Sequence, residues 1–256
     1  MIEILENASE EAIDWVKSNE MIVNPDKFQV MIIGSGKEKE KYKLKINEAE
    51  IESQTSVTLL GVKIDNKLNF NEHISTICKK SGNKINAISR IQGFLDQKEK
   101  EVLINTFVYS NFNYCPLVWH FSTKKSTTKI EKIQERCLRL LHNNTLETYD
   151  VLLKELKKPS MEVRRLRTLA TEIFKTLNDM NPSYMKEIFQ LSKYRTHRKH
   201  DLFIHSRNTT KHGNKSLRVF GAHIWNSLPE SIKKTSSLTT FKDYINSWFR
   251  MQMLFM

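Results

Sequence analysis

Acidic side chains are the first residues to consider, because metal-assisted phosphoryl transfer needs two or three carboxylates that converge on one pair of cations. The aspartates of this chain stand singly, with no adjacent pair. They are Asp14, Asp26, Asp65, Asp96, Asp150, Asp179, Asp201 and Asp243. Acids that alternate with bases at helical spacing are typical of a solvated surface. We therefore expect no metal site and no catalytic residue in this chain.

Four histidines in one basic segment are the next candidates, for zinc chemistry: His197, His200, His205 and His212. His197 and His200 are three residues apart, but no third ligand or orienting acid stands at metal-ligand spacing, so solvated histidines are favoured. The chain also contains no Gly-x-Ser-x-Gly turn, no phosphate-binding glycine loop and no Cys-x-x-Cys pair. These patterns indicate a binding protein without a cofactor rather than an enzyme.

The charge of the chain is distributed unevenly. The 41 Lys and Arg against 29 Asp and Glu give a net charge of +12. Residues 1–60 hold 7 Lys and 12 acids, a net of −5, so the remainder holds 34 bases and 17 acids, a net of +17. Such asymmetry is typical of a basic part that meets a polyanion and an acidic part with another neighbour.

The densest positive charge lies in residues 193–218, which hold eight basic residues and the single acid Asp201. Basic residues that flank an aromatic suit phosphate neutralisation and stacking on an unpaired base. The predicted nucleic-acid-binding residues are Lys193, Tyr194, Arg195, Arg198, Lys199, Arg207, Lys211, Lys215 and Arg218. Alternatively, Tyr194 and the nearby Phe220 anchor this segment on the helical core. A second basic patch, Arg164, Arg165 and Arg167, is better interpreted as a solvated helix face.

Hydropathy and cysteine content indicate the compartment. No uninterrupted apolar run exceeds four residues, whereas a helix needs about 20 to span a bilayer. We therefore expect no membrane partner. The three cysteines, Cys78, Cys115 and Cys137, are far apart and form neither a disulfide framework nor a zinc site. A nuclear or cytoplasmic location fits these features.

Periodicity predicts a small mixed α and β part at the N-terminus. In order, it predicts a helix capped at Ser9 that runs to Asn19, a buried strand 28–33, a hairpin of 42–46 and 50–52, and one strand 57–64 broken at Gly61.

From Asn71 onward the apolar period changes to about 3.6 residues, which predicts helices. They cover 71–91, a stretch opening near Gln97, 126–142, a helix after Ser160, and two short helices near 221–228 and 238–249. The fold class is α+β: a small N-terminal sheet with one helix, followed by a mainly α-helical region. The expected domains are 1–69, 70–192 and 193–256, the last a basic arm with C-terminal helices.

The order of several short motifs resembles the C-terminal part of a reverse transcriptase from a non-LTR (LINE-type, jockey-like) retrotransposon. The residues that carry the resemblance in the first part are Trp15, Asn24-Pro25-Asp26-Lys27, Leu59-Leu60-Gly61-Val62-Lys63-Ile64-Asp65, Leu68 and His73-Ile74. Those in the second part are Tyr114-Cys115 with Trp119, Ile133-Gln134 with Arg139, Phe220-Gly221-Ala222 with Trp225-Asn226-Ser227-Leu228-Pro229, and Phe241-Lys242.

The resemblance implies roles for residues and partners. Lys27 would assist nucleotide positioning or pyrophosphate departure, and Leu60, Gly61 and Val62 would belong to the primer grip. A glycine within a strand also permits a bulge or close approach of a ligand. Residues 1–69 would be a palm remnant, 70–192 a helical thumb, and the partner RNA or DNA, as an RNA–DNA primer and template.

The chain departs from this family where catalysis takes place. A reverse transcriptase needs an early palm aspartate and a Tyr-x-Asp-Asp turn upstream of the Asn-x-x-Lys segment, and neither is present. We therefore expect a truncated or split RNA-directed DNA polymerase that keeps primer and template binding but lacks catalysis, whereas the intact parent would use Mg²⁺. The alternative is a non-catalytic basic helical interaction module with no nucleic-acid partner.

Overall fold

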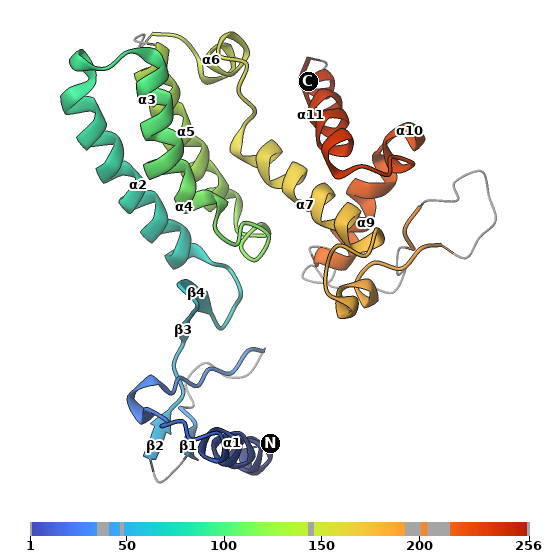
Figure 1. Cartoon of the computed structure of the whole chain (residues 1–256). Helices are drawn as coiled ribbons and strands as arrows, with labels where there is room; N and C mark the ends of the chain where they lie inside the picture. The colour runs from blue at the N-terminus through green and yellow to red at the C-terminus, as the bar shows by residue number, and fades with distance from the viewer. Residues whose placement is uncertain are drawn as a thin grey trace. The chain divides into compact units, whose positions relative to one another are not determined.

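The computed structural model describes residues 2–34, 41–46, 49–142, 146–192, 201–203 and 216–254. The chain divides into two compact units, Met1–His73 and Ile74–Met256 (Figure 1). The first contains two antiparallel hairpins and a helix, and the second is helical. The expected α+β class is therefore confirmed at this level. Among the described residues, no helix has the length and apolar character needed to cross a bilayer.

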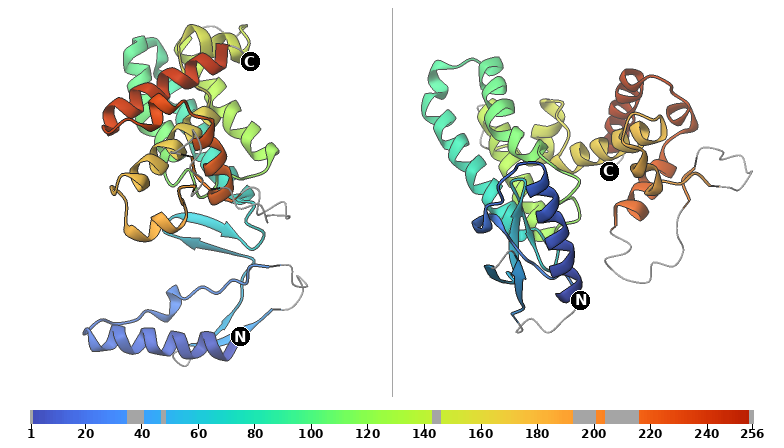
Figure 2. Two further views of the ribbon diagram at one scale, coloured as in Figure 1. Left: turned by 90° about the vertical axis from the view of Figure 1, so that its right-hand side faces the viewer. Right: turned by 60° about the horizontal axis from the view of Figure 1, so that its bottom comes forward.

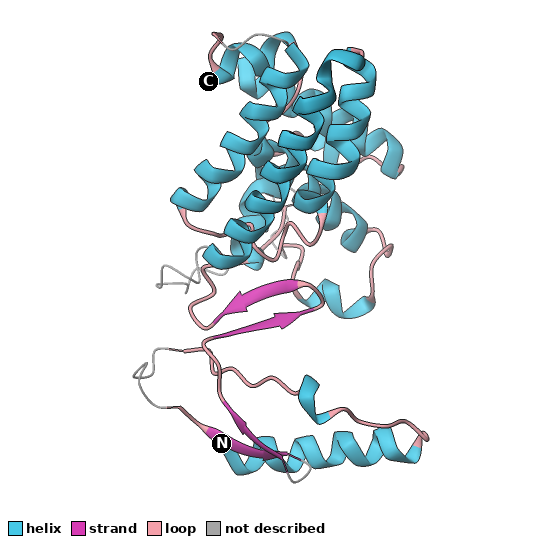
Figure 3. Cartoon of the chain, turned by 90° about the vertical axis from the view of Figure 1, so that its left-hand side faces the viewer, coloured by secondary structure: helices cyan, strands magenta, loops and turns pink. Residues whose placement is uncertain are grey.

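The first unit packs helix α1 (Ile2–Ser18) on the hairpin of β1 (Lys43–Ile46) and β2 (Ala49–Glu52), as Figure 3 shows. The hairpin is antiparallel, as predicted, with Ile46 opposite Ala49. The small core consists of Ile13 from the helix and Leu44 and Ile46 from the strand. A carboxylate joins the two elements, since Glu6 Oε1 accepts a hydrogen bond of 2.8 Å from the amide of Lys45.

Helix α1 begins earlier than predicted. The capping pattern placed the first turn at Ser9, but the helix starts at Ile2. Within it, the Ser9 hydroxyl donates to the carbonyl oxygen of Leu5 at 2.7 Å. A serine can bond in this way inside a helix as well as at its start, so the Ser-Glu-Glu pattern did not identify the boundary.

The predicted strand 28–33 is wrong. This stretch is not part of a sheet in the structure and is only partly buried. Its connections are a backbone bond from the Gln54 amide to the Val30 carbonyl at 2.8 Å and the Gln29 side chain, whose Oε1 accepts from the Thr58 amide at 2.9 Å. Because the side chain of Gln29, and not its backbone, bonds to the Thr58 amide, no ladder of backbone hydrogen bonds forms here.

The single strand predicted for 57–64 is a hairpin instead. Strands β3 (Ser56–Leu59) and β4 (Val62–Asp65) pair antiparallel with Leu59 opposite Val62. The two turn residues have positive φ, 47° at Leu60 and 80° at Gly61. A two-residue turn of this kind matches the twist of the strands and favours glycine. Gly61 therefore reverses the chain rather than breaking one strand.

The second unit is built from nine α-helices among the described residues, shown in Figure 1. They are α2 (Asn71–Ile91, which begins in the first unit), α3 (Gln97–Leu103), α4 (Ser110–Asn113), α5 (Lys124–His142), α6 (Tyr149–Glu155), α7 (Met161–Leu177), α9 (Leu217–Ser227), α10 (Glu230–Lys233) and α11 (Leu238–Leu254). A π-helical segment, Ile104–Tyr109, joins α3 to α4. Single 3₁₀ turns are η1 (Pro25–Lys27), η2 (Gln92–Phe94) and η4 (Ser183–Glu187).

The helices predicted from the 3.6-residue period are confirmed. Helix α2 has the predicted bounds, and α5 starts two residues before the predicted Ser126. Helix α3 opens at Gln97, where the Asp96 carboxylate accepts from the Glu99 amide at 2.7 Å and the Glu99 side chain accepts from the Asp96 amide. This reciprocal capping box satisfies amides that the first turn leaves unpaired.

A large hydrophobic core lies between α7, α9 and α11, which gather in Figures 1 and 2. Phe174 and Phe241 stack with ring centroids 4.3 Å apart, and Trp225 stacks on Phe241 at 5.9 Å. This core joins residues on both sides of the expected domain boundary at 192/193. Helix α7 therefore shares its core with the C-terminal helices rather than ending a separate domain.

A single carboxylate links α5, α6 and α7. Glu131 of α5 accepts from the amides of Met161 at 3.1 Å and Glu162 at 2.9 Å, the first residues of α7. The Tyr149 hydroxyl of α6 lies 2.5 Å from the same carboxylate. The first amides of a helix have no partner within it and carry partial positive charge, so an anion here stabilises the helix start.

We predict that Glu131→Gln lowers the free energy of unfolding by about 1–3 kcal/mol, because the amide NH₂ of glutamine would oppose the donors that the carboxylate accepts. Urea denaturation of the purified chain measures it. The matched control is Glu135→Gln, one turn along α5, whose i,i+4 pair with Arg139 is 2.6 Å long and should contribute about 0.5 kcal/mol or less. Equal losses in the two variants would contradict this role for Glu131.

Candidate nucleic-acid interface

Most of the predicted nucleic-acid-binding residues lie outside the described residues. They are Lys193, Tyr194, Arg195, Arg198, Lys199, Arg207, Lys211 and Lys215. The remaining one, Arg218, is exposed in the first turn of α9 and donates to the carbonyl oxygen of Glu187 at 3.1 Å. The described residues 201–203 lie between the two parts of this basic segment and show how the fold holds it.

The side chain of Asn226 fixes residues 201–203 at the end of α9. Its Oδ1 accepts from the Leu202 amide at 2.7 Å, and its Nδ2 donates to the Leu202 carbonyl at 3.0 Å. Leu202 is buried in the core, and its backbone forms a bridge with Leu191. The flanking bonds, Ser192 N to Asp201 O at 2.9 Å and Phe203 N to Gln190 O at 2.8 Å, complete the attachment. The basic segment is thus fastened to the helical core at its middle.

A buried ion pair reinforces this attachment and corrects the prediction that every aspartate is solvated. Asp201 accepts from Lys233 of α10 at 2.6 Å, and the two side chains are only 12% and 3% exposed. Asp201 is the single acid in residues 193–218, and its charge is already matched by Lys233. The single acid of the segment is therefore paired with a lysine from outside it.

Phe220, beside Arg218, packs inward. Its ring makes an edge-to-face contact with Phe121 at 5.4 Å and lies 5.2 Å from the His120 ring. The alternative that Phe220 anchors the segment is favoured over base stacking. Burial, together with the charge of Arg165, lowers the pKa of His120 to about 4, so this imidazole is neutral near pH 7.

The α7 arginines do not form the solvated helix face that the sequence predicted. Arg165 is only 4% exposed, with its guanidinium 5.5 Å from the centre of the Trp119 ring. Arg164 lies over Tyr109 at 4.3 Å. The prediction failed because α7 packs against α5 as well as against α9 and α11, so little of its surface is free. In the described structure, Nε of Arg164 and Nε and Nη1 of Arg165 are buried without a hydrogen-bond partner.

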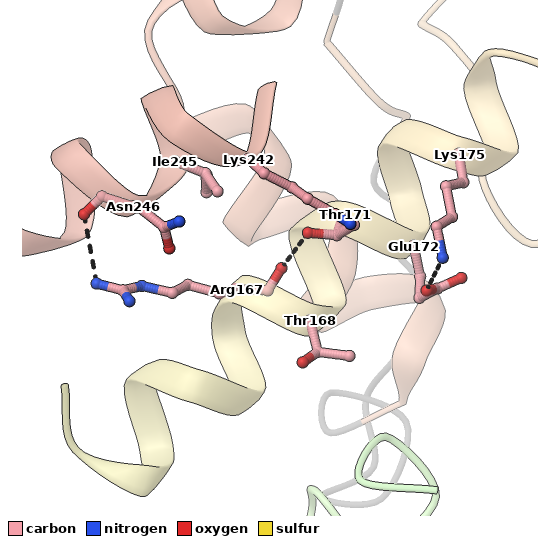
Figure 4. Close-up of a pocket in the computed structure, with 8 residues that line it drawn as sticks. All are labelled: Arg167, Thr168, Thr171, Glu172, Lys175, Lys242, Ile245 and Asn246. Atoms are coloured by element: carbon pink, nitrogen blue, oxygen red, sulfur yellow. Dashed lines mark hydrogen bonds and ion pairs between the residues drawn. The ribbon is translucent and has the colours of Figure 1, made fainter. Parts of the chain in front are cut away.

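A groove of about 310 Å³ lies between α7 and α11 (Figure 4). Its lining residues are Arg167, Thr168, Thr171, Glu172, Lys175, Lys242, Ile245 and Asn246. Arg167 reaches across the groove and donates to the carbonyl oxygen of Asn246 at 3.3 Å, while its Nε is buried without a partner. Burial, followed by the charges of Arg250 and Arg164, lowers the pKa of Arg167 to about 10.

The residues that the resemblance assigned to polymerase functions lie in the first unit. Lys27 is exposed at the end of the short 3₁₀ turn Pro25–Lys27. In the β3–β4 hairpin, Leu60 is 82% exposed at the turn, Gly61 completes the turn, and Val62 is buried. The turn therefore presents Leu60 outward, while Val62 holds the hairpin in place.

Several of the aspartates considered for metal binding have other roles, among them Asp65, Asp96 and Asp201. Asp65 accepts from the amides of Lys67 and Asn69 at 3.1 Å each and of Phe70 at 2.6 Å, which orders the turn before α2. Within the described ranges, no group of three or more His, Cys, Asp or Glu side chains is placed to hold a metal ion. His197, His200, His205 and His212 lie outside those ranges.

Two features of the site were missed by sequence reasoning. Asn226 follows the buried Trp225 in a helix, and its amide carries both a donor and an acceptor, which a backbone clamp requires. The second missed feature is Gly221, because a Cβ there would come within 2.8 Å of the Phe189 ring. The close approach of Phe189, which lies two residues before Leu191, requires a glycine at this point of α9.

We predict that Lys233→Met lowers the free energy of unfolding by about 3 kcal/mol or more, because Asp201 is then left buried without its partner. Chemical denaturation measures the loss. In the double variant Asp201→Asn with Lys233→Met much of the stability should return, since the lone charge is gone. Lys234→Met, at the exposed neighbouring lysine, is the control and should change stability by about 0.5 kcal/mol or less. A loss for Lys233→Met no larger than for Lys234→Met would contradict the ion pair.

Comparison with known proteins does not place the chain in a family, because no family model, no curated protein and no solved structure matches it.

Proposed function

We propose that this chain is the part of a non-LTR retrotransposon reverse transcriptase that follows the catalytic aspartates, and that it binds RNA or DNA without catalysing synthesis. The single observation that carries nucleic-acid binding is the basic segment 193–218. The segment holds eight basic residues and a single acid, Asp201, which forms an ion pair with Lys233. Asn226 and Lys233 hold residues 201–203, in the middle of this segment, on the helical unit.

The positions of the quoted motifs support this proposal. The Leu-Gly-Val motif falls on the β3–β4 hairpin, where a primer grip would need a hairpin with an exposed turn. The Trp-Asn-Ser-Leu-Pro motif falls where α9 meets α10 and contains Asn226. In this proposal 1–69 is a palm remnant and 70–192 a thumb, whose last long helix, α7, shares its core with the helices of the basic-arm region 193–256.

The surface of the first unit is consistent with a missing neighbour. Several large apolar side chains are exposed on and after α1, namely Ile4, Trp15, Met21 and Ile22, in an acidic part of the chain. Exposed apolar side chains that gather in one region mark an interaction surface. In a reverse transcriptase, palm and fingers would cover it. In the alternative, a basic interaction module, a partner protein would, and that binding would survive nuclease treatment.

Salt dependence of binding to a labelled oligonucleotide tests the basic segment. We expect the logarithm of the affinity to fall linearly with the logarithm of the salt concentration, by about 0.7 per phosphate contacted on a single strand. Replacing Arg195 and Arg198 by Ala should reduce the slope by roughly 1.4, because two contacts are lost. Lys98→Ala, an exposed lysine on α3, is the control. A slope near zero for the unaltered chain would refute nucleic-acid binding by this segment.

A primer-extension assay tests the expected absence of catalysis. With an RNA template, a DNA primer, nucleotides and Mg²⁺, we expect no incorporation above background by the purified chain, because the acids that would hold two cations are absent from its sequence. An active reverse transcriptase in the same buffer is the positive control. Template-dependent incorporation that disappears when Mg²⁺ is chelated would contradict the proposal.

A further inference from the structure

The groove between α7 and α11 contains cations without matching anions. It is lined by Arg167, Lys175 and Lys242 and by one acid, Glu172. Glu172 is engaged already, since Lys175 lies 2.7 Å from its Oε1 and Asn181 donates to its Oε2 at 3.2 Å. In the described part of the chain no carboxylate lies within 4 Å of the Arg167 or Lys242 cation. The groove therefore carries an excess of positive charge.

The position of Arg167 makes this excess costly in the absence of a ligand. Its guanidinium is partly buried, its Nε has no hydrogen-bond partner, and it shares its surroundings with Arg164 and Arg250. Like charges that are partly removed from water repel one another more strongly than they would in bulk solvent. An anion in the groove would offset this repulsion.

The form of the groove indicates which anion fits. Arg167 and Lys175 are eight residues apart on α7, which corresponds to about 12 Å along the helix axis, and Lys242 extends from α11 toward α7 in Figure 4. The cations follow a line, as the charges of a strand do. The lining includes no aromatic side chain on which a base could stack. The hydroxyls of Thr168 and Thr171 donate to carbonyls of their own helix, so the charged donors of the lining are Arg167, Lys175 and Lys242.

We propose that the α7–α11 groove binds the sugar-phosphate backbone of a nucleic-acid strand, with Arg167 and Lys242 as its phosphate contacts. This site is separate in sequence from the basic segment 193–218 and rests on the proposed function, which it extends. Backbone contacts fix the position of a strand and carry no sequence information. Binding through the groove is therefore independent of base sequence.

The test measures the salt dependence of binding of the whole chain to a labelled oligothymidylate by fluorescence anisotropy. The double variant Arg167→Gln with Lys242→Gln should reduce the slope by roughly 1.4, and near 0.1 M salt this loss corresponds to an affinity roughly 25-fold lower. Arg167→Lys with Lys242→Arg keeps both charges and should keep the slope. Lys132→Gln, at an exposed lysine of α5, should leave the slope unchanged.

Two further arms separate the possible failures. Lys242 is exposed, so Lys242→Gln alone tests the groove without disturbing the core and should reduce the slope by roughly 0.7. If the groove variants bind like the unaltered chain while Arg195→Ala with Arg198→Ala weakens binding, the groove proposal is overturned and the proposed function stands. If the unaltered chain does not bind the oligonucleotide, both are overturned. If the groove variants lose binding to polyglutamate or to phosphatidylserine vesicles but not to the oligonucleotide, the assignment to nucleic acid is overturned.

Discussion

Helix α7 is covered on two sides, and this constraint determines much of the second unit. One side packs against α5, whose Glu131 accepts from the first amides of α7, and the other packs against α9 and α11 around Phe174. A helix in this position has little surface left for solvent. Its arginines must therefore be accommodated within the protein, although an arginine cannot give up its proton at ordinary pH.

The three α7 arginines are accommodated in two ways. Arg164 and Arg165 lie over the faces of Tyr109 and Trp119, whose electron-rich rings attract a cation. Glu131 and Glu162 also favour the charged form of Arg165, although burial lowers its pKa overall. Arg167 has no ring partner in the described structure and opens instead onto the α7–α11 groove. The same burial that confines two of the arginines to packing thus leaves the third available to a ligand.

Sequence patterns predicted the helices of the second unit well because long amphipathic stripes and caps such as Asp96 are local signals. They failed where tertiary contacts decide the outcome. Gly61 could be identified as special, but only pairing in the hairpin shows that it reverses the chain with Leu60. Arg165 was predicted to be solvent-exposed because the alternation of basic and apolar residues is typical of a helix with one buried face, whereas α7 has two. Of the site, sequence supplied the basic segment and the quoted motifs. The Asn226 clamp and the Asp201 ion pair could not be predicted, because their partners are 24 and 32 residues away.

The Asn226 side chain also explains how a highly charged segment can be attached to a compact helical core. Eight like charges in one stretch repel one another and oppose close packing, so attachment to the core requires contacts that do not use those charges. The structure attaches the segment through Leu202, whose apolar side chain is buried and whose backbone pairs with the amide of Asn226. The ion pair uses Lys233, a lysine from outside the segment. The contacts that attach residues 201–203 therefore come from an amide, an apolar side chain and a lysine outside the segment, and they use none of its eight basic residues.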